Sequence, residues 1–306
     1  MDDQGNLYVI LNRQMIFKLD WNSKLIWKLE GQFNHDLDIQ PDGSIYTLEN
    51  RERSVDFHGQ KIHITDDEVV QVSASGTRSL QWSIFDVFKN YLPEEKFKGI
   101  LAYEKENTAK PNKPKLRADF YIFDVLHTNG VQLLKEAVPD LGQKGDVLLS
   151  MTKINRIAIL DPQSKKIRWE YGPGELDVLH QVTILKNGHL LVFDNGMSRG
   201  HSRVLEIDPR TKLVTWSYDP IGKDSFFAFN RGGAMRLLNG NTLVVSSTDG
   251  RALEVTQDGK IVWEYYRPLV KQPPNPNPKA PWIPRDALYR IRRIEPELVE
   301  RLLKDD

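Results

Sequence analysis

"GNTLVVSSTDGRALEVTQDGKIVWEY" (240–265) decides the fold that we predict for this chain. A glycine precedes a short apolar segment, and an arginine precedes a second one. A turn rich in Asp and Gly then leads to a third segment that ends in Trp-x-Tyr. Short segments with β-branched, alternating residues are typical of strands, and turns of this composition join hairpins. The stretch therefore predicts consecutive antiparallel strands.

The same unit recurs through the chain, closely at 145–171 and 188–218 and more loosely at 5–31 and 43–84. Five tryptophans close the copies: Trp27, Trp82, Trp169, Trp216 and Trp263. A repeat of about 45 residues with four short strands is a β-propeller blade, whereas a β-sandwich does not explain a repeated Trp-terminated unit. We predict an all-β protein, a six-bladed β-propeller. Five blades are readable, and the sixth would come from the chain ends or from an insertion.

The interval between Trp82 and Trp169 exceeds the others by about one unit, which we assign to an insertion at 85–123. Its stretch "YEKENTAKPNKPKLR" (103–117) predicts a surface loop. The propeller would then span 1–268. Residues 269–306 form a C-terminal extension, in which a Pro-rich linker precedes a short amphipathic helix, "PELVERLLKDD" (296–306).

Composition excludes several classes of function. Lys+Arg and Asp+Glu are both 42, so the chain has no basic surplus for a nucleic-acid or membrane partner. The absence of cysteine removes disulfides, thiolate nucleophiles and Cys-based metal sites. No signal peptide is visible at the N-terminus, and nothing in the sequence predicts a cofactor or an oligomeric state.

Three histidines stand at the start of segments that predict the innermost strand of a blade. His35 and His180 each precede the glycine of their unit by eight residues, and His127 lies in a similar context, "LHTNGVQLL". Equivalent positions of successive blades form a ring about a propeller axis. We therefore expect the three imidazoles at the same place in three blades, where the central funnel opens.

Arginines follow the same register. Arg156 and Arg251 lie eleven residues after the glycine of their units, and Arg203 matches them once a four-residue insertion is allowed. The insertion lies in "DNGMSRG" (194–200) and adds Arg199 at a Gly-flanked turn. For Arg156 and Arg203 we favour structural salt bridges between blades. Together with the histidines, these residues predict a cationic funnel with few carboxylates, suited to a sulfate- or phosphate-like group.

At these residues the sequence resembles the arylsulfotransferase family, the bacterial arylsulfate sulfotransferases and their relatives. The matching motifs are "DVLHTNGV", "LHQVTILKNGHLLVFDNGMSRG", "SRVLEID", "GGAMRLLNGNTLV" and "EVTQDGKIVWEY". They cover about 120–266 well and the first 90 residues loosely. The resemblance implies a six-bladed propeller that transfers a sulfuryl group from a phenolic sulfate to a phenol through a transiently sulfated histidine.

The resemblance also implies residue roles. His127 matches an Asp-x-x-His-x-Asn pattern with Asp124 and Asn129, and the sulfated histidine would lie one blade later, where our alignment places Arg251. The expected catalytic residues are His127, His180 and Arg199. The expected substrate-binding residues are His35, Asn129, Asn195 and Arg251.

Other functions stay open at this point. A non-catalytic binding or scaffold propeller that has lost the nucleophile is one alternative, and a quinoprotein-like dehydrogenase is a weaker one because its calcium ligands are not evident. Three histidines suit zinc or copper, but the nearby arginines argue against a metal. The predicted partner is a small aromatic sulfate or phenol. The family suggests a periplasmic or secreted protein.

Overall fold

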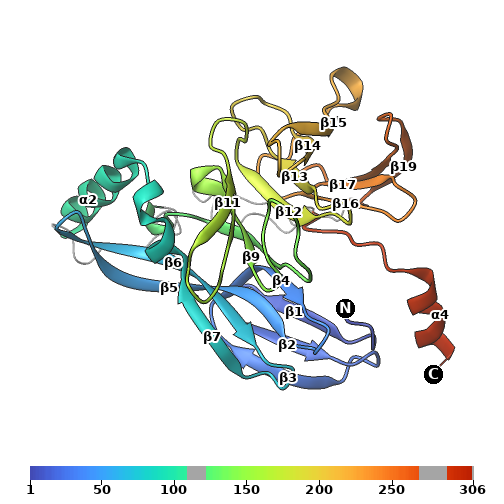
Figure 1. Ribbon diagram of the computed structural model, residues 1–306, viewed down its shortest axis with the longest axis horizontal. Coiled ribbons are helices and arrows are strands. Elements are labelled where there is room, and N and C mark those ends of the chain that lie inside the picture. The colour runs from blue at the N-terminus through green and yellow to red at the C-terminus, as the bar shows by residue number, and fades with distance from the viewer. Residues whose placement is uncertain (109–121, 269–287, 305–306) are drawn as a thin grey trace. The chain divides into compact units, whose positions relative to one another are not determined.

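The computed structural model describes residues 1–108, 122–268 and 288–304, and its strands form five antiparallel sheets (Figure 1). Two compact units divide the chain: unit 1 is Met1–Val131 with Pro296–Asp306, and unit 2 is Gln132–Glu295. The all-β, propeller-type prediction is confirmed. The predicted number of blades is wrong, because the described residues form five blade sheets and not six.

Unit 1 holds the first two sheets. A three-stranded sheet has the order β1 (Leu7–Leu11), β2 (Met15–Leu19) and β3 (Leu25–Glu30). A four-stranded sheet has the order β4 (Phe33–Ile39), β5 (Ile45–Phe57), β6 (Gln60–Val72) and β7 (Arg78–Ser83). β5 and β6 have 13 residues each and pair without interruption from Ile45↔Val72 to Phe57↔Gln60, so this hairpin runs on beyond its blade.

The described part of the insertion is helical, which is why it adds no blade. It forms α1 (Ile84–Phe88) and α2 (Glu94–Thr108), so 103–108 are helix where a surface loop was predicted. Glutamates in the first turn of α2 and a run of good helix formers favour this outcome. The helices pack on the long hairpin: Phe57 and Phe85 have ring centroids 5.9 Å apart, and His63 N–H donates to Glu104 Oε1 at 2.8 Å.

The predicted C-terminal helix is present as α4 (Pro296–Lys304). It belongs to unit 1, where Leu302 is buried against Gly5 and Arg301 binds the Asp3 carbonyl. The predicted linker, 271–284, lies outside the described residues. Among the helices that the structure describes, none has the length and apolarity to cross a membrane.

Unit 2 holds the remaining sheets, and β8 passes into it at Gln132. The third sheet consists of β8 (Thr128–Leu133), β9 (Val147–Met151), β10 (Arg156–Leu160) and β11 (Ile167–Tyr171). The fourth consists of β12 (Leu179–Ile184), β13 (Leu190–Asp194), β14 (Arg203–Ile207) and β15 (Val214–Tyr218). The fifth consists of β16 (Gly233–Arg236), β17 (Thr242–Ser246), β18 (Arg251–Val255) and β19 (Ile261–Tyr266).

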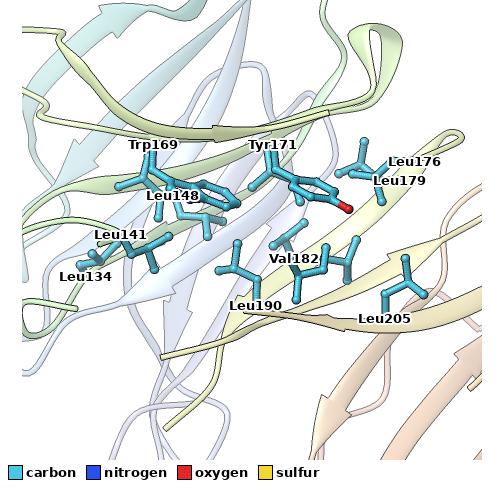
Figure 2. Packing of buried hydrophobic residues seen from close by; sticks show 14 residues of the cluster. Leu134, Leu141, Leu148, Trp169, Tyr171, Leu176, Leu179, Val182, Leu190 and Leu205 are labelled. Atoms are coloured by element: carbon cyan, nitrogen blue, oxygen red, sulfur yellow. The ribbon is translucent and has the colours of Figure 1, made fainter. Parts of the chain in front are cut away.

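Three of the closing tryptophans, Trp27, Trp169 and Trp216, join neighbouring blades, in agreement with the predicted packing between blades. Trp169 packs in a buried cluster with residues of the third and fourth sheets (Figure 2), and its Nε1 donates to the Pro209 carbonyl at 2.8 Å. The same bond recurs from Trp27 to the Ala74 carbonyl at 3.0 Å and from Trp216 to the Gln257 carbonyl at 2.8 Å. In each case the acceptor lies in the outer hairpin turn of the next blade.

Candidate functional site

His127 lies just before β8 and is held by a buried carboxylate. Its ring Nδ1 contacts Asp124 Oδ2, and its backbone N–H donates to Asp124 Oδ1 at 3.1 Å. Asp124 is 1% exposed and forms a parallel bridge with Thr65 of β6. A carboxylate at Nδ1 fixes the orientation of an imidazole and stabilises its charged form. With a side chain 20% exposed, His127 has the support that a proton donor needs.

His35 lies beside His127 in unit 1. The two ring centroids are 4.8 Å apart, with the ring planes at 72°. Both residues have left-handed backbone, with φ 55° at His35 and 50° at His127. That conformation is uncommon outside glycine, and such residues cluster at functional sites. The structure therefore brings two of the three predicted histidines together. Asn129, which follows on β8, is 3% exposed.

Carboxyl groups that the sequence-based prediction did not include lie next to these histidines. Asp67 of β6 accepts hydrogen bonds from Asn50 Nδ2 and from the Thr128 N–H, each at 2.6 Å. Burial, reinforced by the charge of Asp124, raises the pKa of Asp67 to about 7. On the same strand, burial raises the pKa of Asp66 to about 6 although Arg53 Nε lies 2.9 Å away. Unit 1 therefore holds carboxyl groups that keep protons close to neutral pH.

These two groups make unit 1 less stable as the pH rises. Their pKa values in the folded chain, about 6 for Asp66 and about 7 for Asp67, exceed the ordinary 3.8. The folded state then binds protons that the unfolded state releases, so the stabilisation is complete below pH ~4 and is lost as the pH rises through the folded pKa values of about 6 and about 7. Urea unfolding followed by circular dichroism should give a lower midpoint at pH 8 than at pH 4.5. The difference should shrink in Asp67→Asn, and an unchanged difference would contradict this prediction.

His180 does not occupy the position of His35, because the bulges of β4 and β12 differ in length. Opposite the second strand, His180 pairs with Phe193 and Asn34 pairs with Leu48, the equivalent residue of its blade. The bulge after Asn34 holds two residues and the bulge after His180 holds one. The predicted equivalence of the two histidines is therefore wrong by one residue. Counting back from a glycine cannot detect an extra residue in a bulge.

Both ring nitrogens of His180 have partners within unit 2. Nδ1 lies 2.8 Å from Asn195 Oδ1, and Nε2 accepts the Arg231 N–H at 3.2 Å. Asn195 is fully buried and donates in turn to the Ala228 and Arg231 carbonyls, at 2.5 and 2.6 Å. Since Nε2 accepts, these contacts fix the neutral tautomer that carries its proton on Nδ1. His180 and Asn195 thus brace the start of the next blade.

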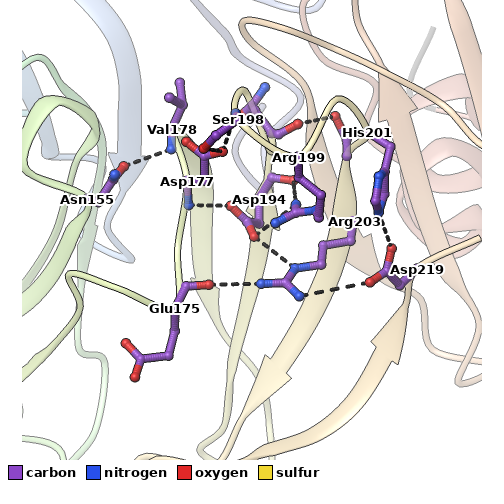
Figure 3. A network of polar contacts seen from close by, with 12 residues as sticks. Asn155, Glu175, Asp177, Val178, Asp194, Ser198, Arg199, His201, Arg203 and Asp219 are labelled. Atoms are coloured by element: carbon purple, nitrogen blue, oxygen red, sulfur yellow. Dashed lines mark hydrogen bonds and ion pairs between the residues drawn. The ribbon is translucent and has the colours of Figure 1, made fainter.

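Arg199 is paired with a buried carboxylate, Asp194, whereas the sequence predicted a cationic funnel with few carboxylates. Figure 3 shows Arg199 and Arg203 both reaching Asp194, with Nη2 of Arg199 at 3.1 Å and Nε of Arg203 at 2.9 Å from Oδ2. Asp194 is fully buried, and Asp219 lies 3.9 Å from Arg203. The expectation was wrong because Asp194, the first residue of "DNGMSRG", turns inward. The arginine charges in this network are therefore compensated within their own blade.

The predicted equivalence of the other arginines is confirmed. Arg156, Arg203 and Arg251 each pair with the last residue of the second strand of their blade. Arg156 Nη1 lies 2.8 Å from Glu170 Oε2, and Arg251 contacts Glu264 in the same way. Both glutamates are the middle residue of a Trp-Glu-Tyr strand end. These salt bridges lie within blades and not between them as predicted.

Arg156→Gln and Arg251→Gln should therefore cost similar amounts of stability. Each variant removes one ion pair with a partly exposed glutamate, which contributes about 1 kcal/mol. Thermal unfolding of the two variants measures the effect. The substrate-binding role of Arg251 stays a prediction, and a loss of sulfuryl transfer confined to Arg251→Gln would support it.

A pocket of about 460 Å³ lies on unit 2 and is lined by residues 137–143 and Arg168. None of the predicted site residues lines it. In the part of the chain that the structure describes, no group of three or more His, Asp or Glu side chains is placed to hold a metal ion.

A sequence model of the arylsulfotransferase (ASST) family matches residues 6–267, which is most of the chain. The chain belongs to the arylsulfotransferase family. The match extends the resemblance to the first two blades, where the motifs are loose. The comparison with curated proteins gives no match.

Solved structures similar to this family member share its fold at low sequence identity. A protein of unknown function from Bacteroides caccae is 11% identical, with a TM-score of 0.50 over 82% of this chain and 74% of its own. A catalytically inactive variant of virginiamycin B lyase from Staphylococcus aureus, solved with quinupristin, is 14% identical, with a TM-score of 0.51 over 88% of this chain and 69% of its own. A streptogramin B lyase is 14% identical, with a TM-score of 0.50 over 88% and 67%.

Proposed function

We propose that this protein transfers the sulfuryl group of a phenolic sulfate to a phenol, with His127 as the residue that protonates the leaving oxygen. The observation that carries the proposal is the contact of Asp124 with Nδ1 of His127, in a member of the arylsulfotransferase family. A phenolate leaves more readily when a proton reaches its oxygen in the transition state. Asp124 favours the imidazolium that supplies this proton.

The reaction balances without a covalent intermediate. The bond between sulfur and the donor's phenolic oxygen breaks, and a bond between sulfur and the acceptor's oxygen forms. His127 gives a proton to the departing oxygen, while His35, whose ring lies 4.8 Å away, takes the proton of the acceptor hydroxyl. Of the two candidate bases, His35 and His180, we choose His35 because its ring lies beside that of His127. A role of His180 and Arg199 in the same reaction stays a prediction.

A second function, a non-catalytic scaffold module, is favoured by one observation in unit 2. Arg199 shares the buried Asp194 with Arg203, and His180 is held between Asn195 and Arg231, so the cationic and donor groups already have partners within the protein. A protein of this kind would keep the blades and use the polar network to hold them together, without turnover.

The test is an assay of the full chain with 4-nitrophenyl sulfate and a phenol acceptor, between pH 5 and 9. Transfer predicts release of nitrophenol that depends on the acceptor and that falls sharply in His127→Asn. No release at any pH would contradict the transfer. Thermal stabilisation by sulfate without any release would support the non-catalytic function instead.

A further inference from the structure

Asp67 is a buried carboxyl that the proposed reaction does not use directly, yet its hydrogen bonds lead to residues next to both histidines of unit 1. It is 3% exposed, and each of its oxygens accepts one hydrogen bond. Oδ2 accepts the Thr128 N–H at 2.6 Å, and Oδ1 accepts Asn50 Nδ2 at 2.6 Å. A buried carboxyl group is costly unless hydrogen bonds satisfy it, and both bonds of Asp67 lead toward the histidines.

The first contact reaches His127. Thr128 directly follows His127, so the bond from its N–H to Asp67 holds the peptide on the C-terminal side of a residue with φ 50°. On the other side, Asp124 binds the His127 N–H and its ring. The left-handed backbone of His127 is thus held from both sides by carboxyl groups, which offsets the strain of that conformation.

The second contact leads to His35. Asn50 donates to Asp67 through Nδ2, and its Oδ1 accepts from Asn34 Nδ2. Asn34 directly precedes His35, which has φ 55°. One carboxyl group therefore contacts the backbone after His127 directly and reaches the side chain of the residue before His35 through an amide pair.

Charge couples the same groups. The titratable side chains placed next to Asp67 or His127 come from β6, from the segment before β8 and from the bulge of β4: Asp66, Asp124, His127 and His35. Asp124 opposes ionisation of Asp67, whereas the charge of His127 favours it. The coupling is mutual, so an ionised Asp67 favours the charged imidazole.

We infer that Asp67 is a positioning residue for His127, which fixes the backbone after His127 and extends upward the pH range in which the His127 imidazole carries its proton. Its catalytic meaning rests on the proposed function. The effects of Asp67 on the backbone and on the protonation of His127 do not depend on the proposed function, because both are properties of the protein without substrate.

The experiment is an NMR titration of the histidine ring C–H signals in the full chain, with His127 assigned by loss of its signal in His127→Asn. Asp67→Asn removes the charge and keeps an oxygen for the Thr128 N–H. We expect the His127 titration to move down by roughly one pH unit in this variant. Asp66→Asn, at an equally buried carboxyl of the same strand, is the matched control and should move it far less.

Two outcomes would overturn the inference. The first is a His127 titration that is the same in Asp67→Asn and in the wild type, with an otherwise conserved amide spectrum. The second is an equal shift in Asp66→Asn, which would reduce the effect to general charge. If the Asp67→Asn spectrum shows an unfolded chain, Asp67→Glu, which restores a charge, should return the fold and the elevated titration together, and failure to do so contradicts the inference. Absence of turnover in the wild type would contradict only the proposed function.

Discussion

His127→Asn should lower kcat/KM for transfer from 4-nitrophenyl sulfate by about 10²- to 10⁴-fold, the usual contribution of a positioned acid or base. Asparagine retains a hydrogen-bonding side chain but cannot transfer a proton at neutral pH. The loss should be greatest for donors with poorly leaving phenolates, because these depend most on protonation of the leaving oxygen. Initial rates with a series of substituted phenyl sulfates measure both effects.

His189→Asn provides the matched control. His189 Nδ1 lies 2.8 Å from Glu206 Oε1, so it forms the same kind of histidine–carboxylate pair, but in unit 2 and at a hairpin turn. A variant at this position should lose little activity. Equal losses in the two variants, or no dependence on the leaving group in His127→Asn, would contradict the role of His127 as the acid.

Trp169→Ala should destabilise the protein by about 3–5 kcal/mol, the range for removal of a large buried aromatic side chain. Trp169 is 6% exposed, lies in the cluster of Figure 2 and bonds the Pro209 carbonyl, so the variant loses both packing and a joint between blades. Trp169→Phe retains most of the packing and should lose about 1–2 kcal/mol. Urea unfolding, fitted with the same slope for each variant, measures the free energy of unfolding.

Trp263 supplies the comparison, because it closes the fifth blade in the same Trp-Glu-Tyr context but is 42% exposed. Its replacement by alanine should cost far less than the replacement of Trp169. A loss for Trp263→Ala as large as that for Trp169→Ala would show that burial in the blade core does not set the effect.

The sequence patterns of strand, turn and closing tryptophan predicted the blades because the same patterns recur in every unit of the chain. Alternation gave the strands, and the spacing of Arg156, Arg203 and Arg251 matched their pairing in the sheets. The partners of the arginines were harder to foresee. Arg203 faces Asp194 because its blade ends in Trp-Ser-Tyr and lacks the glutamate that pairs with Arg156 and Arg251.

The carboxyl side of the candidate site could not be predicted, because its signal resembles that of a loop. Asp67 lies in "ITDDEVV" (64–70), a polar run that interrupts an apolar strand. The structure shows that the run continues β6, with Asp66 and Asp67 buried. Acidic residues are rarely buried, so sequence rules place such a run on the surface. The contact between β6 and residues 124–128 joins distant parts of the chain, and local spacing carries no information about it.

The hydrogen bond from a closing tryptophan to a carbonyl of the next blade bears on how the repeats diverged. The indole of Trp27, Trp169 or Trp216 is bound by a main-chain oxygen, which every amino acid provides. The three acceptor turns, around Ala74, Pro209 and Gln257, accordingly differ in sequence. Mutations that change their side chains leave the docking oxygen in place, so duplicated blades can drift apart in sequence and remain mechanically joined.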